Sequence, residues 1–162
     1  MGRIGLTVFF LSFALSAGAE PRRSLGQVES IAPWLKDRSG EIALFTERLA
    51  RSLGEADVFF VVNPQEEHDA WLVVRTCNRH GKYLPPSSHE GRVCDVSLSD
   101  VHAIHQPPIW YMSPNRIREI FAFAANQQEA IAILTEDIKA AVREQKNAIP
   151  ADAEPRPAAD PR

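Results

Sequence analysis

The sequence predicts an α+β domain in which a small antiparallel sheet of about four strands packs against an N-terminal amphipathic helix and a long C-terminal helix. Two segments, Asp57–Val62 and Ala70–Cys77, carry apolar side chains at successive positions, as strands covered on both faces do. The segments before and after them show the spacing of amphipathic helices. This order of helix, strands and helix is typical of a two-layer fold.

Residues 1–19 have the features of a leader peptide for export. Arg3 supplies a positive charge, Ile4–Leu15 is largely apolar, and Ala17-Gly18-Ala19 has the form of a signal-peptidase site. We expect cleavage before Glu20. The apolar run is shorter than the roughly 20 residues of a membrane span, and no second run follows it. The mature protein is therefore expected to be periplasmic or secreted, without a membrane span.

Removal of the leader leaves 162 − 19 = 143 residues, enough for one domain. Residues 20–30 are predicted to be a flexible lead-in, residues 31–147 the single domain, and residues 148–162 a disordered tail rich in proline and alanine. The formal net charge of the whole chain is −3, with basic and acidic residues interspersed. Nucleic acid is therefore not an expected partner.

The first helix is predicted over about Glu41–Leu53. Asp37 or Ser39 offers an N-cap, and Gly54 offers a C-terminal stop. The apolar positions of this helix follow at steps of three and four residues and share one face. They are Ile42, Phe45, Leu49 and Leu53.

The strands follow this helix. Asp57–Val62 is predicted to be the central strand, and it ends at Asn63-Pro64 because proline cannot donate a hydrogen bond to a neighbouring strand. The connection to Ala70–Cys77 is too short for a helical crossover, so we expect these two strands to be antiparallel. A third strand over Arg92–Leu98 alternates apolar and polar residues, which indicates one buried and one solvated face.

The C-terminal part begins with Pro107-Pro108 and a brief aromatic strand over Ile109–Met112. Ser113-Pro114 then provides an N-cap residue and a proline at the first helical position. Helical spacing continues to about Lys146, interrupted by the polar Asn126-Gln127-Gln128. One long helix and two helices with a break at Asn126 are both compatible with this pattern.

The order of helix, apolar strand and second strand over Glu41–Cys77 is similar to that in small α/β domains of bacterial envelope assembly proteins. Examples are the amino-terminal domain of TolB and the CsgG-type secretion lipoproteins. In those domains a helix usually separates the two strands, and this sequence lacks that helix. The resemblance concerns the fold alone and assigns no functional residue.

The chain has two cysteines, Cys77 and Cys94, and both lie in the part predicted to be exported. Because an even number of cysteines in an oxidising compartment favours pairing, we expect a disulfide bond between them.

The five histidines lie in the same region of the sequence as the cysteines. Imidazole is a preferred ligand of copper and zinc, so a metal site is one hypothesis. His102 and His105, just before a rigid Pro-Pro pair, are the best candidate ligands, and His80 and His89 are further candidates. The competing interpretation is that these are solvated loop residues, since no spacing matches a zinc finger.

The sequence contains no nucleophile elbow, phosphate-binding loop or dinucleotide-binding motif, so we do not expect an enzyme. Ile109, Trp110 and Tyr111 are candidates for partner binding because aromatic residues dominate interface hot spots, although a core strand is the alternative interpretation. We expect a non-catalytic accessory or protein-binding module of the bacterial envelope, without a cofactor, that binds another envelope protein. The alternatives are a periplasmic copper- or zinc-binding protein that uses Cys77–His105, and an enzyme without recognisable motifs.

Overall fold

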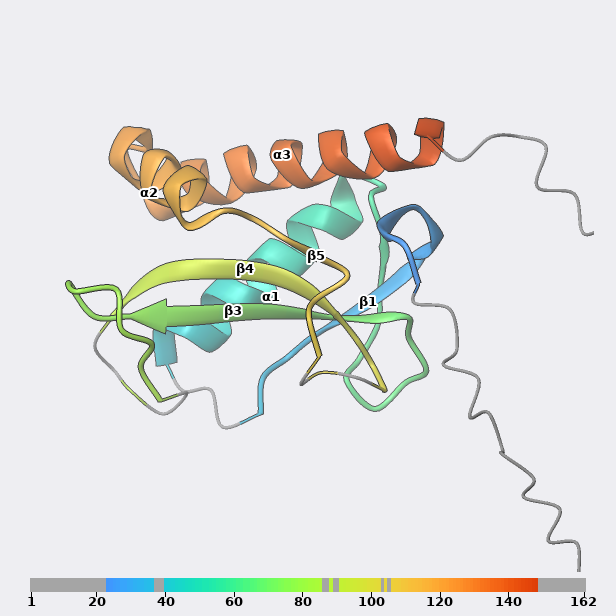
Figure 1. The fold of residues 1–162 in the computed structure, drawn as a ribbon, viewed down its shortest axis with the longest axis horizontal. Helices are drawn as coiled ribbons and strands as arrows, with labels where there is room; N and C mark the ends of the chain where they lie inside the picture. The colour runs from blue at the N-terminus through green and yellow to red at the C-terminus, as the bar shows by residue number, and fades with distance from the viewer. Residues whose placement is uncertain are drawn as a thin grey trace, which may run out of the picture.

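The computed structural model describes residues 23–36, 40–85, 88, 91–102, 104 and 106–148 of the chain. The predicted leader, both N-cap candidates of the first helix and the tail beyond Ala148 lie outside these residues. The described part has an α+β fold: helices cover one face of a five-stranded sheet, and α3 runs along the outside of the helical layer (Figure 1).

The elements follow one another in this order: η1 (Leu25–Gln27), β1 (Ser30–Pro33), α1 (Gly40–Glu55), β2 (Phe60–Val61), β3 (Ala70–Cys77), β4 (Arg92–Asp100), β5 (Trp110–Tyr111), α2 (Pro114–Phe123) and α3 (Gln127–Ala148). Helix α1 packs against β1, β2 and β3, α2 packs against β4, and α3 packs on α1 and α2. None of the described helices combines the length and the apolar character that crossing a membrane requires.

The sheet is mixed, with the strand order β2-β1-β3-β4-β5. β1 is parallel to both of its neighbours, while β3, β4 and β5 form an antiparallel ribbon. The prediction of an α+β fold with a long C-terminal helix is confirmed. The prediction of a purely antiparallel sheet of about four strands is wrong, because β1 was not expected and it inserts between β2 and β3.

The predicted hairpin between the two apolar strands is also replaced by a parallel arrangement. Val61 of β2 and Ala70 of β3 lie opposite the same residue, Ile31 of β1. A parallel connection usually needs a helix because the chain must return along a full strand. Here β2 has only two residues and ends level with the start of β3. The connecting segment therefore only has to cross β1, without returning along a full strand.

β2 is an edge strand and not the central strand predicted over Asp57–Val62. Phe60 and Val62 donate backbone hydrogen bonds to Glu29 and Ile31, so alternate residues of β1 face β2. The next residue of β1 on that side is Pro33, which has no N–H to offer. The pairing of β1 with β2 therefore ends after two positions.

Helix α1 confirms the predicted helix but runs through Gly54 to Glu55, so the predicted stop at Gly54 is wrong. Asp57 takes the left-handed conformation instead, with φ at 54°. The N–H of Val58 bonds to Leu53 O and that of Asp57 to Gly54 O, which together form a Schellman motif. Gly54 has a packing role, since a Cβ atom there would lie 3.1 Å from Val61 Cγ2.

One hydrophobic core joins the sheet face under the helices to α1, α2 and α3. Leu25 and Val28 are fully buried in this core, although the sequence indicated a flexible lead-in over residues 20–30. The part of the lead-in that the structure describes is therefore a component of the fold. Its burial follows from the packing of η1 against α3.

The polar interruption near Asn126 separates two helices, which settles the alternative left open by the sequence. Ser113 caps α2 as predicted, because its side chain accepts a hydrogen bond from Arg116 N. Asn126 Oδ1 accepts one from Glu129 N at 2.9 Å, so Asn126 acts as a cap that starts α3.

The predicted solvated face of the third strand is largely buried. Asp95, Ser97 and Ser99 of β4 are all less than 9% exposed. Serine side chains are short, and these two lie between longer neighbours on the same face: Trp71 is opposite Ser99, and Val73 is opposite Ser97. Alternation of polar and apolar residues along β4 therefore did not indicate exposure to water.

Candidate functional site

The main surface feature beside the sheet edge is an open groove of about 980 Å³ between β2 and the outer side of α1. We call it the β2 groove. It is built from four parts of the chain: β1 with its flanking residues, the second half of α1, β2 with its flanking residues, and Lys146 near the end of α3. Its walls include Pro33, Ala50, Gly54, Phe60, Val61 and Lys146.

Among the described residues, nothing pairs with the outer edge of β2, so its backbone has free hydrogen-bonding groups at this groove. The N–H groups of Phe60 and Val62 point to β1, where they bond to Glu29 O at 2.8 Å and Ile31 O at 3.0 Å. Because backbone groups alternate along a strand, the N–H and C=O of Val61 point to the opposite side, toward the groove. An added strand would find a donor and an acceptor there.

The side chains of β2 are also open to solvent. Phe60 is 77% exposed and Val61 is 38% exposed, which is unusual for large apolar residues in a sheet. Val61 lies against Gly54 of α1, and the absence of a side chain at Gly54 lets the strand approach the helix closely. The groove therefore has an apolar floor beside a free strand edge.

The charged residues of the β2 groove are mostly acidic. Two basic side chains, Arg51 and Lys146, lie among five carboxylates. These carboxylates are Glu29, Glu47, Glu55, Asp57 and Glu66. No ion pair is formed by any of these seven groups among the described residues. The field at the groove is therefore negative and favours a cationic partner.

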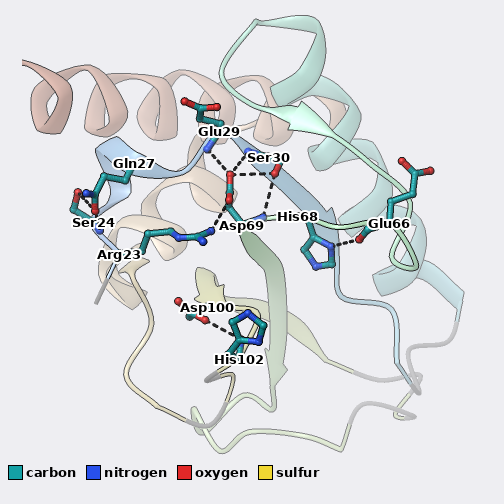
Figure 2. Close-up of polar contacts among 10 residues, drawn as sticks. All are labelled: Arg23, Ser24, Gln27, Glu29, Ser30, Glu66, His68, Asp69, Asp100 and His102. Atoms are coloured by element: carbon teal, nitrogen blue, oxygen red, sulfur yellow. Dashed lines mark hydrogen bonds and ion pairs between the residues drawn. The ribbon is translucent and has the colours of Figure 1, made fainter. Parts of the chain in front are cut away.

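A polar cluster at the start of β3 holds β1 in place (Figure 2). Asp69 Oδ2 accepts hydrogen bonds from the N–H groups of Glu29 and Ser30, both at 2.9 Å, and from Ser30 Oγ at 3.1 Å. Arg23 forms an ion pair with the other oxygen of Asp69. Partial burial alone would raise the pKa of Asp69, but these hydrogen bonds and the charge of Arg23 outweigh it and hold the pKa below its ordinary value. Within the described part of the chain no further acid or base bonds to Asp69, and the contacts of the cluster are those of a structural site.

The candidate metal ligands are not gathered at one place. His80 lies in the turn after β3, and His102 follows β4. Since Ala70 at the start of β3 pairs with Asp100 at the end of β4, the two histidines lie at opposite ends of this ribbon, roughly 20 Å apart at the usual rise per residue. One ion cannot bind both.

Both of these histidines are exposed, and His89 and His105 lie outside the described residues. Arg79 Nε donates to His80 Nε2, and the backbone N–H of His102 donates to Asp100 Oδ1. Within the described ranges, no three side chains of His, Cys, Asp or Glu gather as metal ligands would. A site at His102 and His105 stays a prediction.

Cys77 and Cys94 lie side by side at the open end of the β3–β4 ribbon. Register shifts between Arg75 and Thr76, so that Cys94 is the extra residue of a β-bulge. Both thiols are free, and that of Cys94 is in hydrogen-bond contact with Cys77. Burial, reinforced by this contact, raises the pKa of Cys94 to about 12. The structure shows no bond between these neighbouring residues, and the disulfide bond stays a prediction.

The three predicted partner-binding residues have different environments. Ile109 and Trp110 are half-buried and pack against the core, and Tyr111 is 64% exposed at the other edge of the sheet. The residues of the β2 groove were missed because the apolar run around Phe60 was interpreted as a buried central strand. The nearby Pro33 and Pro64 were the available signal, since both limit how far a strand can pair here.

No protein-family model matches this sequence, and no curated protein or solved structure matches it.

Proposed function

We propose that this protein is an exported, non-catalytic binding module of the bacterial envelope that binds an extended, basic segment of a partner protein along the free edge of β2. The observation that carries the proposal is the unpaired edge at Val61 beside an acidic groove. An extended peptide can add a strand to such an edge, with main-chain hydrogen bonds for affinity and side-chain pockets for specificity. The leader-like residues 1–19 support export.

The charge of the groove favours a basic segment over an acidic one. Five carboxylates face two basic groups, so a lysine- or arginine-containing strand gains favourable contacts and an acidic strand meets repulsion. Phe60 and Val61 add apolar contact for alternate side chains of the bound segment. The edge at β5 is less suited to binding a basic strand, since Trp110 is half-buried there and β5 borders no comparable acidic groove among the described residues.

The test is binding of a labelled peptide that alternates valine and lysine, followed by fluorescence anisotropy, with a valine and glutamate peptide as the comparison. We expect the basic peptide to bind about tenfold more tightly than the acidic one at low salt, and the difference to shrink as salt is added. Equal binding of both peptides would contradict the proposed charge preference.

Two variants locate the site. Val61→Pro removes the outward N–H together with the valine side chain, and Phe60→Ser removes the exposed ring while the backbone stays intact; each should weaken the basic peptide about fivefold to tenfold. Tyr111→Pro is the matched control, because it makes the same kind of change at the other edge of the sheet. Loss of binding in the control with normal binding in Val61→Pro would place the partner at β5 and overturn the proposal.

A further inference from the structure

A second pocket, of about 550 Å³, lies where β3 ends and β4 begins. These two strands are separated from β2 by β1 in the sheet. The pocket is enclosed by the first turns of α1, by α2 and by the open end of β3 and β4. Figure 1 shows α2 over this end of the β3–β4 ribbon. Its volume falls in the range of roughly 300–1,000 Å³ that small-molecule sites occupy. We call it the thiol pocket, after Cys77 and Cys94 in its wall.

The interior of the thiol pocket is apolar. Phe45 and Cys77 are buried and form its deepest part, and Ile42 and Val93 are half-buried along its sides. The ring of Phe121 on α2 lies 5.9 Å from the ring of Phe45. Phe121 is 38% exposed, so the aromatic wall extends from the core to the surface. Such a lining favours a hydrocarbon group over a polar one.

The thiol of Cys94 leaves its part of the pocket wall uncharged. Burial raises the pKa of Cys94 to about 12, so this thiol is neutral at the pH of any ordinary compartment. A disulfide bond between Cys77 and Cys94 would be uncharged as well. In either redox state Cys94 can contact a hydrocarbon chain without the cost of a buried charge.

The rim of the pocket carries two guanidinium groups, those of Arg92 and Arg118. Both residues are exposed, and neither guanidinium group has a hydrogen bond or an ion pair within the part of the chain that the structure describes. Arg116 on the same helix is different, because Asp137 and Glu119 bind it. Among the described lining residues Glu41 is the one carboxylate, so the described part of the rim carries more positive than negative groups.

We propose that the thiol pocket binds a single-chain amphiphilic anion: an acyl chain that enters the apolar interior and ends in a carboxylate beside Arg92 and Arg118. An apolar interior with a cationic rim is complementary to that combination. The acyl chain of the ligand would contact Phe45 and Phe121. Its carboxylate would bind an unpaired guanidinium group at the rim. This site shares no lining residue with the β2 groove and does not depend on the function proposed there.

The test compares ligands with the same chain and different head groups. Each of decanoate, decanol and decyltrimethylammonium is added to the full-length protein with a bound neutral fluorescent probe, N-phenylnaphthylamine, and displacement of the probe is measured. We expect decanoate to compete at the lowest concentration, decanol at about fivefold higher concentration, and the cation least well. Equal competition by all three, or no probe binding, would overturn the proposal.

Variants separate the rim from the interior. The double variant Arg92→Gln/Arg118→Gln should weaken decanoate about fivefold or more and leave decanol unchanged, whereas Arg143→Gln, an exposed arginine of α3 outside the pocket, should change neither. Ala122→Trp, at an exposed position of the lining, should block all three ligands. Unchanged decanoate binding in the double variant would contradict the assigned rim.

A vesicle experiment distinguishes a free acyl chain from a membrane surface. Co-sedimentation of the protein with phosphatidylglycerol vesicles, without displacement of the probe by decanoate, would show that an anionic bilayer is the ligand. That result would also overturn the proposal.

Discussion

Asp69 Oδ2 lies 2.9 Å from the backbone nitrogen of Ser30, although 39 residues separate them in the chain. The same oxygen accepts the N–H of Glu29, and Asp69 N donates in return to Ser30 O at 3.1 Å. These bonds join the start of β1 to the start of β3. Because β2 pairs only with β1, they also fix the position of the β2 groove.

Asp69→Asn should lower the free energy of unfolding by about 1–3 kcal/mol, because a charged acceptor of three hydrogen bonds and one ion pair becomes neutral. Urea denaturation measures the change. Asp100→Asn is the control, since Asp100 accepts only a local bond from His102 N and should cost less than about 1 kcal/mol. Equal losses in the two variants would contradict the role given to Asp69.

The pH dependence follows from the lowered pKa of Asp69. A carboxyl group whose pKa is lower in the folded state contributes stability above its unfolded pKa, near 3.8, and that stability is lost as the pH falls through the folded value. The difference between wild type and Asp69→Asn should therefore be constant near neutral pH and shrink below about pH 4. A difference that does not depend on pH would contradict this account.

Asp57→Gly should raise the free energy of unfolding by roughly 0.5–1 kcal/mol. Asp57 holds the left-handed position of the Schellman motif after α1, with φ at 54°, and glycine adopts this conformation without a Cβ clash. Thermal denaturation monitored by circular dichroism measures the effect. A destabilised variant would show that the Asp57 side chain makes a contact that outweighs its backbone strain.

Asp95→Asn should change stability at pH 7 by less than about 1 kcal/mol, in contrast to Asp69→Asn. Burial raises the pKa of Asp95, and the ion pair with Arg75 at 3.1 Å and a hydrogen bond with Tyr83 oppose this only in part. Asp95 Oδ1 is also buried without a hydrogen-bond partner. Because the Arg75 side chain is 43% exposed, it stays solvated when Asp95 loses its charge, so removal of the Asp95 charge costs little. Because the pKa of Asp95 is higher in the folded state, wild-type stability falls as the pH rises from the unfolded-state pKa to the folded-state pKa. The Asp95→Asn variant should lack that decline. A loss of several kcal/mol would show that the Arg75 pair dominates.

The predicted disulfide bond is tested by alkylating the denatured protein, purified without reductant from an oxidising compartment. We expect neither Cys77 nor Cys94 to be alkylated until reductant is added, because the fold places the two thiols in contact. Closing this loop should stabilise the oxidised form by roughly 3 kcal/mol relative to the reduced one. Complete alkylation without reductant would contradict the bond and weaken the argument for export.

The parts of the fold that depend on local patterns were predictable. The helix around Phe45 and Leu49, the strand Ala70–Cys77 and the Ser113 cap all follow from periodicity or from one side chain's hydrogen bond. Strand β1 was not predictable in this way, because four residues that end in proline carry a weak strand signal. Its pairing depends on contacts such as that between Ser30 and Asp69, which no local window contains.

The same gap explains the missed site. With β1 absent from the prediction, Asp57–Val62 had to be central, and its exposed edge could not be foreseen. The candidate residues at the other edge, Trp110 and Tyr111, were found from composition alone, which does not distinguish a core strand from a binding surface. Position in the sheet decides between these two roles, and that position is a tertiary property.

Amide hydrogen exchange of Val61, resolved by NMR, tests the central claim most directly. In the free protein the Val61 N–H should exchange fast while those of Phe60 and Val62, bonded to β1, are protected. Addition of the basic peptide should protect Val61 and leave Tyr111 unchanged. A Val61 amide that is already protected in the free protein, or that stays unprotected when the peptide is bound, would contradict strand addition at β2.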